Sequence, residues 1–272
     1  MNLSVDMMTL AQATGAVLAC AGATGLWTHL MLSRRSTQLL AEDRERLARE
    51  DGGGSSWRSC LLEQAGLGMV HPETARTLHD SGEIDAAALE SCEKRQTEKH
   101  RRKASAVAFA LALACSAIGY ACTGVAGAVV GSLAALICVY DFETRTVPPL
   151  PSLILGVAAC GCFERDVPSC LGVLAATFVF LRMGVSMLNS FTGGSVYGDG
   201  DVALTAAAAP LAVPSATLYP AFALFGVLIV ELAALLAYKA KVNTRHVPIP
   251  MGPLYLPPIL MCMVVSAYLC AA

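Results

Sequence analysis

Charge is scarce over most of this sequence. Residues 33–103 hold 13 of the 19 Lys+Arg and 13 of the 21 Asp+Glu, so the rest of the chain carries six basic and eight acidic side chains. Charged residues make up 15% of the chain and hydrophobic residues 55%, whereas about a quarter of a soluble domain is charged. This distribution excludes a single water-soluble globule. It predicts an all-α, polytopic transmembrane helix bundle with one polar insert.

Several patterns of known function are also missing. No basic stripe interleaved with aromatic residues is present, which excludes nucleic acid as a partner. The eleven cysteines contain no CxxC pair, and the insert holds only Cys60 and Cys92, so no zinc site is expected there and no metal or cofactor is indicated. Cys160, Cys162 and Cys170 flank a short loop; free thiols are favoured, and a disulfide among them stays open.

The first apolar run indicates a retained membrane anchor. Met7–Leu32 is long enough to span a bilayer core, no basic residue precedes it, and Arg34 and Arg35 follow it directly. A secretory signal peptide has the reverse order of charge. The sequence therefore predicts an anchor over residues 1–32 with its N-terminus outside.

The polar insert, residues 33–103, follows the anchor. Thr37–Glu50 reads as a charged helix, residues 51–56 as a flexible Gly/Ser break, and Leu61–Glu90 as short helices. Both ends of the insert are basic, which places it in the cytoplasm.

A membrane-embedded domain is predicted over residues 104–272. Its Gly- and Ala-rich apolar segments suit close helix packing in lipid. With the anchor they give about eight spans, the seven further ones lying near 104–121, 123–140, 150–164, 168–189, 202–215, 217–238 and 249–270. Counting from a cytoplasmic insert puts the loops at Asp141 and Asp201 inside and the loop at 163–168 outside. A plasma (inner) membrane location follows.

Acidic residues interrupt this apolar sequence at two places. Asp141 ends the run 125–140, and Asp199 and Asp201 directly precede the run 202–213. A single aspartate at a helix end commonly caps the helix, but two on one membrane face can converge. Two adjacent carboxylates share one proton, so that one activates water and the other protonates the scissile carbonyl. Ionisable residues near membrane spans are functional candidates by default.

Three segments resemble the type IV prepilin peptidases, GxGD membrane aspartic proteases related to the archaeal preflagellin peptidases. Asp141-Phe-Glu-Thr-Arg-Thr-Val-Pro148 is similar to the family's Asp after an apolar helix followed by a polar stretch and Ile/Val-Pro. Gly193-Gly-Ser-Val-Tyr-Gly-Asp-Gly-Asp201 is similar to the loop that ends in GxGD. Val247-Pro-Ile-Pro-Met-Gly-Pro253 is similar to the Ile-Pro-Phe-Gly-Pro segment that opens the last helix. Their order and spacing match over roughly residues 104–272.

The resemblance implies an aspartic endopeptidase with Asp141 and Asp201 as its catalytic pair. Its substrates, and its protein partners, would be prepilin-like precursors cut at the cytoplasmic membrane face between a basic leader and an apolar helix. Asp199 is read as setting the charge of the loop. The positions expected to support substrate and loop are Gly198, Asp199, Gly200, Pro148, Pro250, Gly252 and Pro253.

The chain also departs from this family. Pro149 stands where Asn or Asp is usual, and Ala203 where a Lys is common. The insert lacks the four-cysteine zinc module of the long, bifunctional members, so their methyltransferase activity is not carried over. A solvated spacer is favoured for the insert over a module that holds the substrate leader or a partner.

Two further charges lie inside apolar runs. Arg182 precedes Ser190 by eight residues, and Glu231 precedes Lys239 by eight. Because both lie at similar depth and an unpaired charge there is unfavourable, a buried Arg182–Glu231 pair is a candidate. The alternative is that each faces a watery cavity.

Two other functions compete with the peptidase. A presenilin-like protease would share the Tyr140-Asp141 pair, but Glu143 and Arg145 put Asp141 at the membrane edge, and no Pro-Ala-Leu motif is present. The other is a non-catalytic transporter or assembly protein whose aspartates bind cations or protons. The halves of the chain show no inverted repeat, which favours the peptidase.

Overall fold

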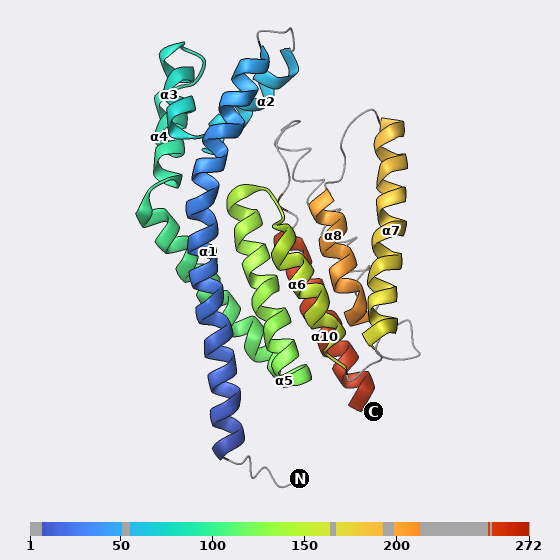
Figure 1. Ribbon diagram of the computed structural model, residues 1–272. Coiled ribbons are helices and arrows are strands. Elements are labelled where there is room, and N and C mark those ends of the chain that lie inside the picture. The colour runs from blue at the N-terminus through green and yellow to red at the C-terminus, as the bar shows by residue number, and fades with distance from the viewer. Residues whose placement is uncertain are drawn as a thin grey trace. The chain divides into compact units, whose positions relative to one another are not determined.

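The computed structural model describes residues 7–50, 55–163, 167–192, 199–212, 250 and 252–271 (Figure 1). Within these ranges every regular element is a helix, which confirms the all-α prediction. The predicted span 217–238 lies outside the described residues. The helices are α1 (Met7–Glu50), α2 (Ser55–Gly66), α3 (Pro72–Asp80), α4 (Ala86–Arg95), α5 (Glu98–Thr144), α6 (Pro149–Cys160), α7 (Val167–Thr192), α8 (Asp199–Ala208) with its 3-10 continuation η1 (Ala209–Ala212), and α10 (Gly252–Ala271).

Among the described residues, four helices are long and apolar enough to cross a membrane: α1, α5, α7 and α10. Large apolar side chains stay exposed along them; Phe180 is 77% exposed and Tyr268 74%. Exposed apolar surface of this extent on several helices marks contact with lipid or another apolar partner. A membrane protein with several apolar helices is therefore the class that the fold supports.

The anchor and the charged helix after it are one continuous helix, α1, rather than two elements. The sequence between them, Ser33-Arg-Arg-Ser-Thr37, contains neither Gly nor Pro, so nothing interrupts the backbone hydrogen bonds. Arg35 also reaches two turns along α1 to form a bidentate pair with Glu42 at 2.6 and 3.1 Å. At the predicted boundary at residue 32 the sequence thus changes from apolar to polar, but helix α1 continues without a break.

Helix α5 is a hairpin of two limbs rather than one straight helix. Thr123 and Gly124 have non-helical backbone angles, and Gly124 has φ +66°, which glycine adopts without a Cβ clash. The backbones of Gly119 and Gly127 touch, and Gly131 touches the carbonyl of Cys115. In each contact the two residues lie at equal distances in sequence from Thr123, so the two limbs run antiparallel. The turn falls at the start of the predicted span 123–140, just after the span 104–121.

One predicted span is shorter than expected, and another begins earlier than expected. The span expected over 150–164 is helical only over Pro149–Cys160, because the chain turns at Gly161. The span expected over 202–215 begins earlier, at Asp199, and its described part ends in η1 at Ala212. At 1.5 Å per residue a helix of 12 residues covers only about 18 Å of a bilayer core of about 30 Å.

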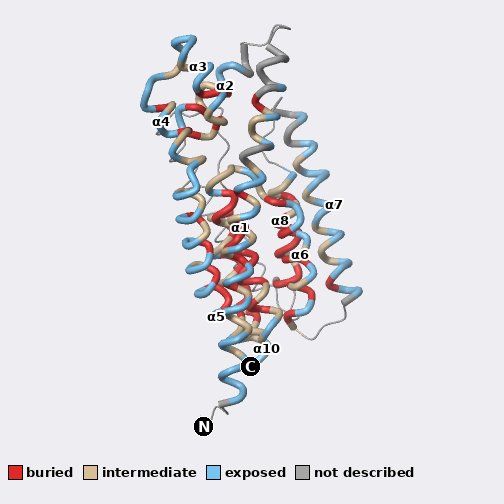
Figure 2. The backbone as a smooth tube through the Cα atoms, turned by 60° about the vertical axis from the view of Figure 1, so that its left-hand side comes forward, coloured by how far each residue is buried: buried red, intermediate tan, exposed pale blue. Residues whose placement is uncertain are grey.

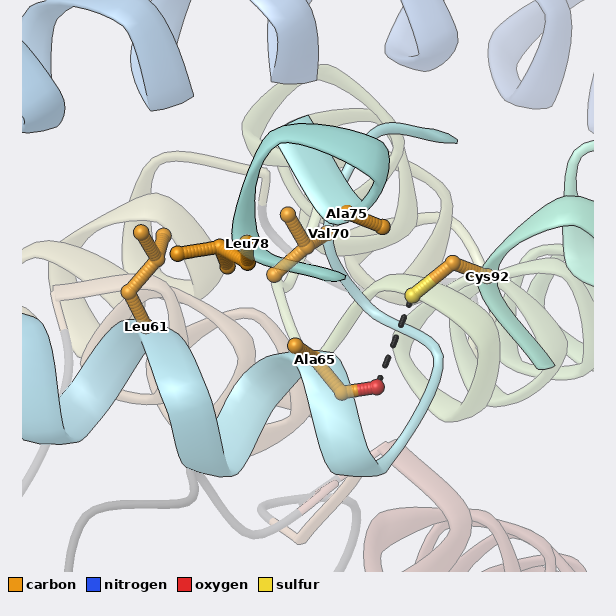
Figure 3. Packing of buried hydrophobic residues seen from close by; sticks show 6 residues of the cluster. All are labelled: Leu61, Ala65, Val70, Ala75, Leu78 and Cys92. Atoms are coloured by element: carbon orange, nitrogen blue, oxygen red, sulfur yellow. Dashed lines mark hydrogen bonds between the residues drawn. The ribbon is translucent and has the colours of Figure 1, made fainter. Parts of the chain in front are cut away.

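By their contacts the described residues form two compact units. One contains α1 up to Gly25, α5 from Val107, and α6 to α10; the other contains α1 from Leu26, helices α2 to α4, and the start of α5 up to Ala106. The second unit has an apolar core of its own within the predicted insert (Figure 3). Its fully buried members are Leu61, Ala65, Val70, Ala75, Leu78 and Cys92.

Local signals start and orient the small helices of this unit. Helix α3 has Pro72 at its first position and His71 as its cap, and α4 is capped by Asp85, which accepts from Ala88 N–H at 2.8 Å. The Asp43 carboxylate of α1 accepts from His71 N–H at 2.9 Å, which ties α3 to α1. Gly68, at φ +70°, lies so close to α4 that a Cβ would meet the Ser91 carbonyl oxygen at 2.9 Å.

Glu83 and Cys92 of the insert have local hydrogen-bond partners. Hydrogen bonds from Arg58 and then Ser81 lower the pKa of the Glu83 carboxyl to about 2, so this ion pair persists at neutral pH. Burial raises the pKa of the Cys92 thiol, which donates to the Ala65 carbonyl at 3.4 Å. A protonated, buried thiol of this kind serves packing. The side chain of Cys60 lies outside the described residues.

Truncation of Leu78 tests whether the insert is a folded unit. Leu78 is 3% exposed in the insert core, so Leu78→Ala is expected to destabilise the unit by about 2–4 kcal/mol. Hydrogen exchange of the amides of α2 to α4 in the full-length protein measures this. Leu67, 38% exposed, is the matched control, and Leu67→Ala should change stability by less than about 0.5 kcal/mol. Equal effects of the two changes would contradict a packed core and restore the solvated spacer.

The first unit packs its helices around α5, α6 and α8, where the buried residues concentrate (Figure 2). Helix α6 packs on α7 and α8, and η1 packs on α6, α7 and α10. A cluster of Ala21, Ala112, Cys115 and Ala135 joins α1 to both limbs of α5 and to α10. Small residues at these contacts let the helix backbones approach closely.

Candidate functional site

Asp141 is buried at the end of the second limb of α5, with 2% of its surface exposed. Its Oδ2 accepts a hydrogen bond of 2.7 Å from the backbone N–H of Gly252 at the start of α10. A Cβ on Gly252 would lie 2.9 Å from both the Asp141 Cβ and the Ile137 carbonyl oxygen. The contact thus requires glycine, and it joins the first predicted motif to the third.

The chain turns sharply directly after Asp141. Arg145 adopts φ +56° and donates its N–H to the Asp141 carbonyl at 2.7 Å, which closes the last turn of α5. Its guanidinium lies over the Phe142 ring, 5.6 Å from the centroid, a distance at which a cation is attracted to the ring face. The polar stretch after Asp141 is therefore a helix-terminating turn.

The GxGD segment meets this same turn. A Cβ on Gly200 would lie 2.8 Å from the Val147 Cβ and 3.2 Å from the Val147 carbonyl oxygen. Gly200 lies in the first turn of α8 and has no positive φ, so close approach to Val147 explains the glycine. Gly198 lies outside the described residues. Two close glycine contacts thus connect all three motif segments, at the end where α6, α8 and α10 begin (Figure 1).

Asp201 is partly buried in the first turn of α8. Its carbonyl accepts the Thr205 hydroxyl at 2.8 Å, and the Thr205 Oγ1 lies 2.6 Å from the Tyr255 hydroxyl of α10. Because threonine has one hydroxyl hydrogen and gives it to Asp201, Tyr255 is the donor in the second bond. This buried chain of hydrogen bonds fixes the start of α8 against α10, one turn beyond Gly252.

A second polar bond holds the same two elements further along. The buried Ser266 hydroxyl of α10 donates to the carbonyl of Leu211 in η1 at 2.8 Å. In apolar surroundings such interhelical hydrogen bonds favour one packing arrangement. Helix α10 is thereby fixed at Asp141, at Thr205 and at Leu211.

Asp199 differs from Asp201 in environment. It is 77% exposed on its side chain and forms an ion pair with Arg182 of α7. The predicted partner of Arg182, Glu231, lies outside the described residues. The Arg182–Asp199 pair links α7 to the first residue of α8.

The predicted prolines occupy helix starts. Pro148 is buried, caps α6, and accepts the Ser152 hydroxyl at 2.9 Å through its carbonyl. Pro253 is the second residue of α10, where its missing N–H leaves no unmade helical bond. Pro250 directly precedes this start and is partly buried. All three fix the backbone beside Asp141 rather than offering a reactive group.

Thr205, Tyr255 and Val147 are parts of this site that the sequence reasoning missed. Thr205 could have been found as the only hydroxyl residue in the run 202–213, one helical turn after Asp201. Tyr255 follows the third motif at helical spacing from Gly252. Nothing in the sequence marks Val147 as the residue that Gly200 contacts.

Loss of the Tyr255 hydroxyl should weaken the α8–α10 contact. Tyr255→Phe and Thr205→Val are each expected to lower stability by about 1 kcal/mol. Because the two groups bond each other, the double variant should lose less than the sum of the single losses. Thermal unfolding in detergent measures the cycle, with Tyr268→Phe as control because Tyr268 is 74% exposed. Additive losses would show that the hydroxyls do not interact.

Within the described residues no group of three or more His, Cys, Asp or Glu side chains is arranged to hold a metal ion. Comparison with protein-family models, with curated proteins and with solved structures finds no match to this chain. The resemblance to the prepilin peptidases therefore rests on the three motif segments of the sequence alone.

Proposed function

We propose that this protein is a membrane aspartic endopeptidase that removes the leader peptide of prepilin-like precursors. The observation that carries the proposal is that the three motif segments meet, because Gly252 contacts the buried Asp141 and Gly200 contacts Val147 in the turn that follows it. These segments are separated by about 50 residues or more in the sequence. Both contacts require glycine, because a Cβ at Gly200 or Gly252 would lie too close to the facing residue.

In this proposal Asp141 and Asp201 share one proton. The ionised carboxylate takes a proton from water, which attacks the scissile carbonyl, while the protonated partner donates its proton to the carbonyl oxygen. The first carboxyl group, now protonated, then donates to the leaving amine, and the partner takes its proton back from a hydroxyl of the diol intermediate. No covalent intermediate, metal or cofactor is needed. Asp141 is buried and held by a backbone donor, whereas Asp201 is partly exposed. Two carboxylates in such different environments suit different protonation states.

The proposed topology has about eight spans across the plasma (inner) membrane. The insert lies in the cytoplasm, and the aspartates lie at the cytoplasmic face, where the substrate leader is. The basic ends of the insert support this orientation. The antiparallel limbs of α5 support the count, because they supply two crossings within one apolar stretch.

The test is cleavage of a precursor with a basic leader, a glycine and an apolar helix. Co-expression with the wild-type protein is expected to give a shortened product whose new N-terminus lies at the leader boundary, as N-terminal sequencing would show. A transporter or assembly protein that uses the aspartates for cations or protons would leave the precursor intact. An uncut precursor in membranes that contain the folded protein would overturn the proposal.

A further inference from the structure

The end of α6 and the start of α7 bring two cysteines together. Cys160 is the last residue of α6, Cys170 lies in the first turn of α7, and both are buried, at 3% and 5% exposure. Their side chains are in hydrogen-bonding contact, and both are thiols in the structure. The two helix ends lie side by side in Figure 1.

An independent contact fixes this register. A Cβ on Gly156 would lie 2.7 Å from Leu174 Cδ1, so Gly156 faces Leu174 across the antiparallel pair α6 and α7. One helical turn further along α6 is Cys160, and one turn back along α7 is Cys170. The glycine also lets the helices approach closely. A disulfide needs a Cα separation of roughly 4.4–6.8 Å, which only closely packed helices reach.

Cys162 has other partners although it lies near Cys160 in sequence. Its thiol donates to the Ala158 carbonyl at 3.5 Å and contacts the Thr123 side chain at the α5 turn. Of the three cysteines that flank this loop, the packing thus selects one pair.

We propose that Cys160 and Cys170 form a disulfide in the mature protein and join α6 to α7. The bond rests on the orientation given in the proposed function, which puts this loop outside, where disulfides persist. It joins α6, which begins in the turn after Asp141, to α7, which carries Arg182. The disulfide therefore holds the α6–α7 register that the Gly156–Leu174 contact already favours.

The oxidant belongs to the class of disulfide donors, such as an oxidised dithiol protein. One cysteine thiolate attacks the donor disulfide and forms a mixed disulfide, which releases one donor thiolate. The second cysteine thiolate then attacks the first cysteine sulfur, forms the Cys160–Cys170 bond, and releases the second donor thiolate. The two protons and two electrons of the cysteine pair end on the reduced donor.

Thiol trapping in intact cells tests the bond. Cells expressing the full chain are quenched in acid, the denatured protein is alkylated with a mass-tagged maleimide with or without prior reduction, and peptides are mapped. Reduction should expose two more thiols in the wild type and in Cys162→Ser, and none in Cys160→Ser or Cys170→Ser. The unreduced wild type should give a peptide that links Cys160 to Cys170.

Full alkylation of both cysteines without reductant would overturn the disulfide, and so would a linked peptide that contains Cys162. Precursor cleavage measured on the same cells separates this result from the peptidase proposal. An active protein with two free thiols refutes the disulfide alone, whereas a disulfide-bonded protein that leaves the precursor uncut refutes the peptidase alone.

Discussion

Replacement of Asp141 or of Asp201 by asparagine should abolish precursor cleavage. An amide cannot take a proton from water or donate one as a carboxylic acid, so each change removes one member of a pair that acts as a unit. We expect a loss of at least about a thousand-fold in rate for each single variant, within the range for general acid–base groups. The double variant should be no worse than either single one.

The structure explains why these variants should still fold. Asparagine keeps the shape of aspartate, and its amide oxygen can accept the Gly252 N–H that Asp141 accepts at 2.7 Å. The matched control is Asp199→Asn, two residues before Asp201, which loses only an exposed ion pair with Arg182. Asp199→Asn should keep most activity. Full activity in Asp141→Asn or Asp201→Asn would refute the shared-proton pair, and so would equal loss in all three variants.

Addition of one methyl group at Gly252 should also impair cleavage severely. In Gly252→Ala the new Cβ would lie 2.9 Å from the Asp141 Cβ and from the Ile137 carbonyl oxygen, and neither is the end of a flexible side chain. The start of α10 must then move away from Asp141 and lose its 2.7 Å hydrogen bond. Misplacement of a catalytic group by about 1 Å can lower the rate about a hundred-fold.

Gly200→Ala should act in the same direction, because its Cβ would meet Val147 at 2.8 Å and would push α8 from the turn after Asp141. Gly172→Ala and Gly184→Ala are matched controls in α7, since no atom lies within 4 Å of either added Cβ. The measurement is the cleavage rate at saturating and at low substrate, with thermal unfolding to verify folding. If Gly252→Ala were as active as Gly184→Ala, the Asp141–Gly252 contact would have no part in the reaction.

The route from sequence to site depended on polarity and on spacing. Apolar runs ending in Asp141, or beginning at Asp201, predicted helices that end or start at these residues, and α5 and α8 do so within three residues. These features are local, because helix formation and helix ends depend on neighbouring residues.

Other features could not be predicted because they depend on which helices become neighbours. The selection of Cys160 and Cys170 over Cys162 follows from the α6–α7 register, and the Thr205–Tyr255 bond follows from the packing of α8 on α10. Glu231, the candidate partner of Arg182, lies outside the described residues, and the structure shows Arg182 paired with Asp199 across the α7–α8 contact. Sequence spacing along one helix says nothing about the partner that another helix presents.

The sequence by itself determined that the chain is helical, that much of it is apolar enough for a membrane, and that Asp141 and Asp201 lie beside the ends of apolar segments. These properties follow from composition and from the 3.6-residue period, which need no long-range contact. The tertiary structure decided that α1 runs on into the insert, that α5 folds back at Gly124, and that three distant segments meet at Asp141. Those outcomes depend on packing between residues far apart in sequence, where a single Cβ decides whether two backbones can touch.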